Sequence, residues 1–349
     1  MRQLFSFIII LIFSYSVSYS QIGGRGVYEF LNLNTSARIA ALGGKQISLY
    51  DGDVNMAYYN PSLVDNDMSR KLAINYVNYF AGINWGNTSY LFHNNKIGNV
   101  VIGITYLNYG EFIKADETGY IDGNFTASDY TFYASYSRKI DSNIIVGITV
   151  KPVYSQYESY NSFGIASDLG ITYHNPEKLF TAAFVMRNIG TQIKPYNAHN
   201  YEPLPFELQL GVTQRLRHAP FRFSLMLHNL QRFDYTYTIE KEDDLIDDPF
   251  FDDTNEKSKM QEFSDKLFRH FIAGVEFIPT KSFVFRLGYN YQRLKEMQIE
   301  NKAGTVGISW GFGLLLTKYH INFSRATYHM AGASNHFSIT ANLSELKRL

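Results

Sequence analysis

The chain has 349 residues, and its 32 basic and 32 acidic side chains give a formal net charge of +0. This balance provides no strong positive field to attract phosphates, so nucleic acid is not expected as a partner. The chain has no cysteine, which excludes disulfides, thiolate metal sites and cysteine nucleophiles. Tyr and Phe are abundant, with 27 of each, although the mean hydropathy is only −0.20. A membrane β-barrel reconciles these facts, because only one face of its wall meets lipid.

Residues 1–20 are typical of a signal peptide. Arg2 supplies the positive start, residues 4–13 form a nearly unbroken apolar run, and the small residues Ser18 and Ser20 precede a plausible cleavage site before Gln21. The alternative is a single membrane anchor, which takes roughly 20 apolar residues. The run here is shorter, so we predict secretion across the inner membrane.

Residues 21–69 differ from the rest of the chain and are predicted to form a plug segment. Residues 36–44 suggest a short helix that is capped by Ser36 and stopped by two glycines. Residues 51–53 resemble a turn, and residues 58–62 an extended stretch that enters a second short helix with proline in its first turn. These pieces lack a core of their own, so we expect them inside the mouth of a barrel, shielded from lipid. The plug motif consists of Ser36, Arg38, Gly43, Gly44, Asn60 and Pro61.

From Leu72 onward the sequence alternates apolar and polar residues, as strands with one apolar face do. Near the C-terminus, for example, Phe337 and Ile339 alternate with Ser338 and Thr340. We predict an all-β fold, in which residues 70–349 form a transmembrane antiparallel barrel of about 14 strands. The predicted strands are 70–80, 84–93, 98–108, 128–140, 143–157, 162–174, 179–188, 205–216, 220–233, 268–278, 283–293, 304–315, 318–329 and 334–343.

The predicted connections alternate between tight turns and long loops. The long ones lie near 109–127, 189–204, 234–267 and 294–303. Outer-membrane barrels place short turns in the periplasm and long loops outside. We therefore expect an outer-membrane protein with both termini in the periplasm and its long loops at the cell surface.

The predicted loop at 240–256 is strongly acidic and surrounds two adjacent aromatic residues. Its carboxylates could hold Ca²⁺, but their spacing fits no EF-hand, and a solvated loop is favoured. The two phenylalanines could anchor a partner or fold back onto the barrel rim. As candidate partner-binding residues we name Asp243, Asp244, Asp247, Asp248, Phe250, Phe251, Asp252 and Asp253.

No motif in the sequence predicts catalysis, a cofactor or a metal. The Ser-x-x-Lys spacing at 344–347 lacks the Ser-Asp-Asn and Lys-Thr-Gly elements of the serine enzymes that use it. His320 and His336 fall on polar strand faces, where hydrogen bonding in the lumen is favoured over metal binding. We therefore expect no enzyme. Charged residues at polar strand positions are expected to pair inside the lumen, or alternatively to line a conduit for an anionic solute. They are Lys151, Arg187, Arg286 and Arg325, with Glu207, Glu276 or Asp168 as partners.

Residues 36–44 (Ser-Ala-Arg-Ile-Ala-Ala-Leu-Gly-Gly) and 54–63 (Val-Asn-Met-Ala-Tyr-Tyr-Asn-Pro-Ser-Leu) resemble the N-terminal signature of the PorV/PorQ group. These proteins are fourteen-stranded outer-membrane barrels related to the FadL-type fatty-acid transporters. The acidic outer loop and the overall length resemble the PorQ branch more than the PorV branch. The polar tail at 344–349 departs from the aromatic end of many outer-membrane barrels.

The resemblance implies a role in the type IX secretion system of Bacteroidetes. A PorQ-like chain would be a non-catalytic scaffold for the attachment complex, contacting PorZ most directly, together with PorU and PorV, in a membrane that contains lipopolysaccharide. The FadL relation leaves a second hypothesis, a transporter of hydrophobic or lipid-like molecules. A purely structural envelope protein is the third. A closed, polar lumen would favour the scaffold, and an apolar pocket beside the plug, open sideways, would favour transport.

Overall fold

A computed structural model describes residues 26–79, 81–94, 98–198, 200–234, 259–297, 305–329 and 332–346. The predicted signal peptide at 1–20 and the acidic loop at 240–256, with its candidate partner-binding residues, lie outside the described residues.

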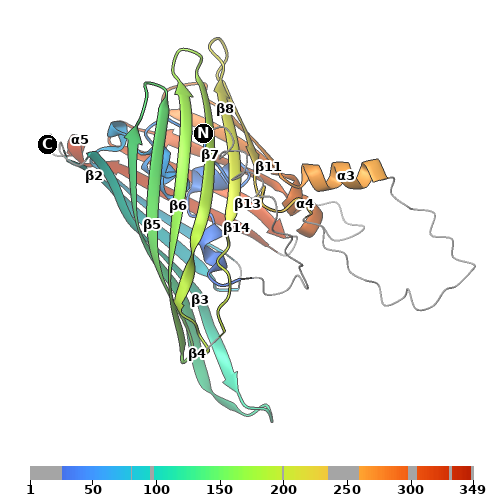
Figure 1. The fold of residues 1–349 in the computed structure, drawn as a ribbon. Helices are drawn as coiled ribbons and strands as arrows, with labels where there is room; N and C mark the ends of the chain where they lie inside the picture. The colour runs from blue at the N-terminus through green and yellow to red at the C-terminus, as the bar shows by residue number, and fades with distance from the viewer. Residues whose placement is uncertain are drawn as a thin grey trace, which may run out of the picture.

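The described residues form fourteen antiparallel strands that close into a barrel, in which β1 pairs with both β2 and β14 (Figure 1). The predicted fold class is therefore confirmed. The strands are β1 (Lys71–Asn78), β2 (Asn84–Asn94), β3 (Gly98–Ala115), β4 (Ile121–Lys139), β5 (Ile144–Tyr157), β6 (Tyr160–Asn175), β7 (Phe180–Lys194), β8 (Glu207–Arg215), β9 (Phe221–Leu227), β10 (Phe271–Phe277), β11 (Phe283–Asn290), β12 (Ile308–Leu315), β13 (Tyr319–His329) and β14 (Gly332–Asn342).

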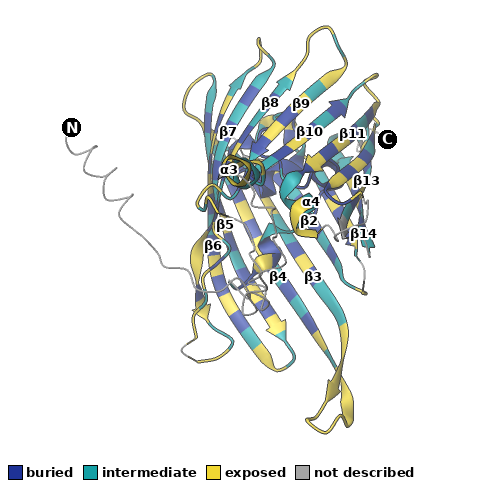
Figure 2. Cartoon of the chain, turned by 90° about the vertical axis from the view of Figure 1, so that its right-hand side faces the viewer, coloured by how far each residue is buried: buried dark blue, intermediate teal, exposed yellow. Residues whose placement is uncertain are grey.

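The side chains of the wall alternate between the interior and the outer surface (Figure 2). On β14, Ser338 is 1% exposed, whereas its neighbours Phe337 and Ile339 are 47% and 48% exposed. Large aliphatic and aromatic residues occupy the outer positions on the other strands too. The alternation predicted from the sequence is confirmed, and its apolar half forms the surface that meets lipid.

The wall is much taller on one side than on the other. β3 and β4 have 18 and 19 residues, whereas β9 and β10 have 7 each. The β3–β4 hairpin runs far beyond the barrel (Figure 1), and its pairing continues at Glu111 with Thr126 and at Phe112 with Phe125. The prediction of a loop at 109–127 was therefore wrong, because most of that segment is paired strand.

Two predicted strands end earlier than expected. β9, predicted through residue 233, ends at Leu227, and β11, predicted through residue 293, ends at Asn290. Beyond them lie two helices, α3 (Lys259–Phe268) and α4 (Tyr291–Met297), and α5 (Leu343–Leu346) follows β14. Among the described helices, each is too short or too polar to pass through a bilayer.

Candidate functional site

Residues 26–68 fill the barrel interior as a plug of short helices. These are η1 (Glu29–Asn32), α2 (Ala37–Ala41), η2 (Val54–Tyr58), η3 (Pro61–Leu63) and η4 (Asn66–Met68). Most plug residues are buried, because the wall encloses them on all sides.

Local sequence explains most of the helix ends in the plug. Asn60 accepts a hydrogen bond from the backbone N–H of Ser62 at 2.9 Å, and Pro61 opens η3 as predicted. Gly43 and Gly44 follow α2 with φ of +95° and +101°, conformations that favour glycine.

Two local predictions were wrong. Ser36 occupies the N-cap position of α2, but its hydroxyl makes no capping hydrogen bond, and the first helical N–H, that of Ala37, donates to the wall residue Ser338 at 2.9 Å. The stretch that precedes Asn60 is not extended, because η2 forms there with Asp53 as its cap.

Hydrogen bonds tie the plug to strands around the whole circumference. Besides the bond from Ala37 to β14, the backbone N–H of Gly43 donates to Ser309 on β12 at 3.0 Å. On the opposite wall, the Asn60 amide donates to Thr172 on β6 at 3.1 Å. Further bonds join Gln46 to Ser224, Ser48 to Thr213, Ala57 to Ser135 and Asn34 to Trp85. Anchors on so many separate strands fix the plug in one position.

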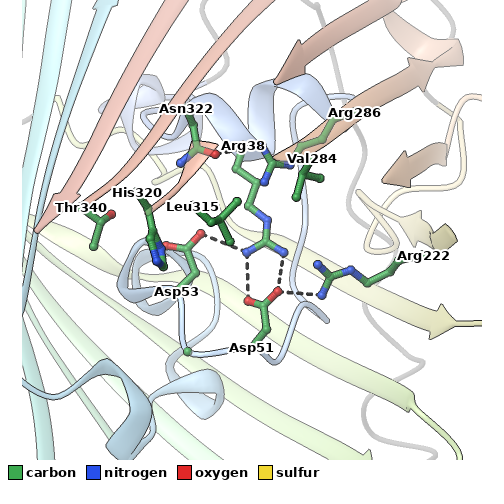
Figure 3. Close-up of a pocket in the computed structure, with 11 residues that line it drawn as sticks. Arg38, Asp51, Asp53, Arg222, Val284, Arg286, Leu315, His320, Asn322 and Thr340 are labelled. Carbon is green, nitrogen blue, oxygen red and sulfur yellow. Dashed lines mark hydrogen bonds and ion pairs between the residues drawn. The ribbon is translucent and has the colours of Figure 1, made fainter. Parts of the chain in front are cut away.

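Arg38 is the centre of a charge cluster between the plug and the wall (Figure 3). Its guanidinium contacts Asp51 Oδ2 at 2.6 Å, Asp53 Oδ2 at 3.1 Å and Glu276 Oε1 at 3.2 Å. Glu276, on β10, also contacts Arg222 on β9 at 2.6 Å and Arg286 on β11 at 2.9 Å. Arg222 closes the ring with Asp51 at 2.7 Å. Three guanidiniums thus face three carboxylates, which satisfies buried charge in pairs.

The cluster gives the plug a defined pH dependence. Burial alone would raise the pKa of Asp51, but the guanidiniums of Arg38 and Arg222 outweigh burial and hold that pKa well below its usual range. A carboxyl whose pKa falls on folding adds stability above its unfolded pKa of about 4, and this stability is lost as the pH falls through the lower folded value.

We therefore predict that the plug is equally well docked at about pH 7 and about pH 5, and loosens only well below about pH 4. Hydrogen–deuterium exchange of peptides from residues 35–68, corrected for intrinsic rates, would measure this. The Asp51→Asn variant should exchange faster at about pH 7 and about pH 5, and its difference from the wild type should shrink as Asp51 itself becomes protonated. Loosening between about pH 6 and pH 5 would assign the transition to a histidine instead.

A second group of charges lies on the opposite wall. Lys151 Nζ contacts Asp168 Oδ2 at 2.5 Å, with both side chains fully buried. Arg187 lies over the rings of Tyr58 and Tyr59, at 5.7 and 5.6 Å from their centroids. Glu207 pairs with the plug residue Lys45. Lys151 and Arg286 therefore have the partners predicted for them, whereas Arg187 contacts aromatic rings and the Leu31 carbonyl.

The prediction for Arg325 was wrong. Its side chain is exposed and shares the outward parity of Ile321 and Phe323 on β13, so it does not enter the lumen. Conversely, Arg222 belongs to the charge cluster but was not among the lumen charges predicted from the sequence. Its signal was present, because Arg222 lies between the outward-facing Phe221 and Phe223 and must point inward.

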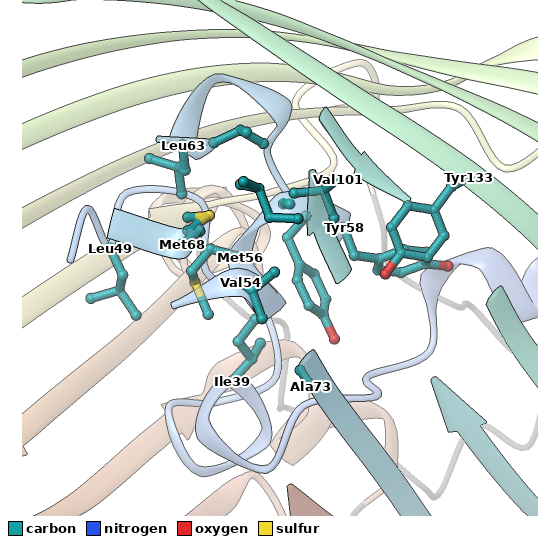
Figure 4. Close-up of a cluster of buried hydrophobic side chains, with 14 of the residues drawn as sticks. Ile39, Leu49, Val54, Met56, Tyr58, Leu63, Met68, Ala73, Val101 and Tyr133 are labelled. Carbon is teal, nitrogen blue, oxygen red and sulfur yellow. The ribbon is translucent and has the colours of Figure 1, made fainter. Parts of the chain in front are cut away.

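An apolar core joins the plug to the other side of the wall (Figure 4). Plug residues such as Ile39, Met56 and Leu63 pack in one buried cluster with the wall residues Val101 and Tyr133. The plug was predicted to lack a core of its own, but 11 of the 15 residues in this cluster belong to the plug, and four wall residues complete it. This burial adds hydrophobic stabilisation to the hydrogen bonds and ion pairs.

Wall glycines allow the plug backbone to lie directly against the strands. A Cβ atom at Gly288 on β11 would lie 2.1 Å from the backbone nitrogen of Gly43. A Cβ atom at Gly147 on β5 would lie 2.4 Å from the backbone of Pro61 and Ser62. Any larger residue at these positions would push the plug away from the wall.

The cavity beside Arg38 is small and polar. Its volume is about 70 Å³, and its lining includes Asp51, Asp53, Arg286 and His320. A polar cavity of this volume has room for ordered water. Within the described part of the chain, no cluster of three potential metal ligands occurs. The cavity is therefore part of the ion-pair network around Arg38.

No family model matches the sequence, and no curated protein matches it. Among solved structures, the chain is similar to a deletion mutant of the monoaromatic hydrocarbon channel TodX, with 12% identity, a TM-score of 0.52, and coverage of 90% of this chain and 98% of that one. It is also similar to the toluene transporter TbuX of Ralstonia pickettii, with 11% identity, a TM-score of 0.47, and coverage of 89% and 98%. A FadL homologue from Pseudomonas aeruginosa has 9% identity and a TM-score of 0.44, with coverage of 88% and 97%.

At such low identity the likeness to the TodX mutant concerns the fold alone. The chain has a closed fourteen-stranded barrel whose fold is similar to that of the TodX mutant.

Proposed function

We propose that this chain is a non-catalytic outer-membrane scaffold, with the role that PorQ-like proteins have in the attachment complex of type IX secretion. The supporting observation is the interior, which is filled by a plug bonded to many strands and joined to the wall by balanced buried charges. A solute would have to break this network to pass. A barrel built in this way is suited to anchoring other proteins rather than to conducting solutes.

The β3–β4 hairpin supplies the surface for such anchoring. Beyond the barrel it exposes Ile113, Tyr120 and Ile121, with exposed fractions of 67%, 70% and 59%. The stacked rings of Phe112 and Phe125, 5.2 Å apart, stiffen its stem. Isolated hairpins are marginally stable in water, so a long hairpin that exposes several large apolar side chains is best explained by a partner that covers them. In the proposed orientation it projects from the cell surface toward PorZ, with PorU and PorV in the same assembly.

The proposal predicts that a shortened hairpin loses its partner. In the variant, a two-residue Asn-Gly turn replaces residues 112–125 and joins Glu111 to Thr126, which already face each other. The barrel should still fold, and affinity isolation from gently solubilised outer membranes should recover no large surface protein with it.

Two further variants sharpen this test. Ile113→Ser, Tyr120→Ser and Ile121→Ser together keep the hairpin but remove its apolar surface, and this triple variant should also lose the partner. Deletion of residues 240–256 tests the acidic loop separately. An intact complex after removal of both segments would refute the scaffold.

Transport of hydrophobic molecules is the second candidate, and the comparisons favour it in general terms because the TodX mutant with the similar fold is a hydrocarbon channel. An apolar groove of about 520 Å³ on the outer wall fits this reading, with Ile102, Phe132 and Val150 in its lining. Pro152 lies there too, and the β4–β5 pairing is interrupted between Thr131 and Ala134 because proline lacks an N–H.

The inner side of the groove is covered, which weighs against transport. The ring of Tyr133 lies directly behind Gly103, where an added Cβ atom would be 2.4 Å from it. Transport predicts that the purified barrel binds long-chain fatty acids or toluene, and that cells without it lose their uptake. If neither effect is observed, the transport hypothesis is refuted and the scaffold hypothesis stands.

A further inference from the structure

Helix α3 projects sideways from the barrel, across the direction of the strands (Figure 1). In the view turned by 90° the same helix is seen nearly end-on, in front of the wall (Figure 2). It therefore points away from the barrel rather than along its axis. A helix with this direction runs parallel to the plane of any membrane around the barrel.

The helix exposes its apolar face. Met260, Phe263 and Leu267 follow one another at intervals of three and four residues, so they share one face. Their exposed fractions are 73%, 52% and 38%, and that of Phe268 is 52%. A helix in water normally shows the opposite arrangement, with its apolar stripe toward the protein.

The polar side of the helix is held by the protein instead. Asp265 accepts a hydrogen bond from the Tyr291 hydroxyl on α4 at 2.8 Å and pairs with Arg269 at 2.9 Å. Lys266 pairs with Asp234 at 2.9 Å. The bond from Tyr291 and the pair between Lys266 and Asp234 orient the helix about its own axis, with its apolar face left exposed.

The C-terminal end of α3 adjoins the outward-facing apolar surface of the barrel. The ring of Phe268 lies 5.9 Å from that of Phe271, the first residue of β10. Next to it on β9, Phe223 and Leu225 face outward, 45% and 40% exposed. This is the low side of the wall, where β9 and β10 have 7 residues each. A strand that crosses the hydrocarbon region needs about 9–11 residues.

We propose that α3 is an interfacial helix, which lies at the membrane–water boundary with Met260, Phe263 and Leu267 among the lipid chains. The occupant of this face is membrane lipid. The apolar residues extend the lipid-facing surface where the strands are short, and the charged face stays in the headgroup region. The inference rests on insertion of the barrel into a membrane and is independent of the scaffold role.

Tryptophan fluorescence in reconstituted phosphatidylcholine vesicles tests this assignment. Trp310 faces outward and Trp85 is buried, so a Trp310→Phe background removes the lipid-facing signal of the native chain. In this background Phe263→Trp reports from the apolar face. Gln261→Trp is the matched control on the opposite face, about 160° away around the helix. A heat-dependent shift in electrophoretic mobility confirms that each variant is folded.

We expect lipids brominated near the headgroup to quench Phe263→Trp several-fold more strongly than Gln261→Trp. Acrylamide in the water should show the reverse order. Equal quenching of both variants by the brominated lipid, or access of acrylamide to both, would overturn the assignment. The hairpin variants, which test the scaffold role, should not change the quenching of tryptophan on α3. Either proposal can therefore be refuted without affecting the other.

Discussion

Replacement of Glu276 by alanine is expected to destabilise the barrel by about 3–5 kcal/mol, because it breaks a buried ion-pair network from one side. Glu276 is 1% exposed and contacts Arg38, Arg222 and Arg286. Without it, three guanidiniums share the two remaining carboxylates, Asp51 and Asp53. The midpoint of guanidinium-induced unfolding in detergent, followed by tryptophan fluorescence, should fall accordingly.

A charge-balanced double variant separates this effect from simple loss of packing. Glu276→Ala combined with Arg286→Met leaves two guanidiniums facing two carboxylates, so it should unfold at a higher denaturant concentration than Glu276→Ala alone. If the single variant unfolds at the wild-type midpoint, the cluster does not hold the plug.

The barrel was predictable because membrane strands repeat a simple rule. Most outward positions are apolar, so alternation located all fourteen strands to within a few residues at most ends. The same rule explains the misses. The β3–β4 hairpin leaves the membrane, where both faces meet water and nothing enforces alternation. At the end of β11, Asn290 accepts a hydrogen bond from the Arg293 N–H at 2.9 Å. This cap begins α4 directly after β11, whereas the residue pattern predicted that the strand continues to residue 293.

The candidate site was predictable only in part. Inward parity identified Glu276, Arg286, Lys151 and Asp168 as lumen charges. It could not show that Arg38 meets Glu276, because that contact joins residues 238 positions apart through the placement of the plug. Likewise, the need for glycine at Gly147 and Gly288 is explained only by the plug backbone that lies against them in the folded barrel. Such contacts depend on the closed tertiary structure rather than on any local pattern.

Substitution of Gly288 by valine is expected to open the barrel interior. A Cβ atom at this position would lie 2.1 Å from Gly43 N and 2.3 Å from the Leu42 carbonyl carbon, and backbone atoms in a bonded plug cannot move aside cheaply. Overpacking of this kind costs about 1–3 kcal/mol, which raises the undocked fraction of the plug about 5- to 150-fold. Protease should then cleave within residues 35–68, and vesicles that contain the variant should conduct ions that the wild type blocks.

Ala273→Val is the matched control, because Ala273 lies on the neighbouring strand β10 and faces outward. It introduces the same side chain without touching the plug, so conductance should stay at the wild-type level. If Gly288→Val leaves both protease resistance and conductance unchanged, the contact between α2 and β11 does not hold the plug in place. If the wild-type barrel already conducts, the plug does not close the lumen, and the transport hypothesis becomes the stronger one. The experiment therefore tests the feature on which the scaffold and transporter hypotheses differ.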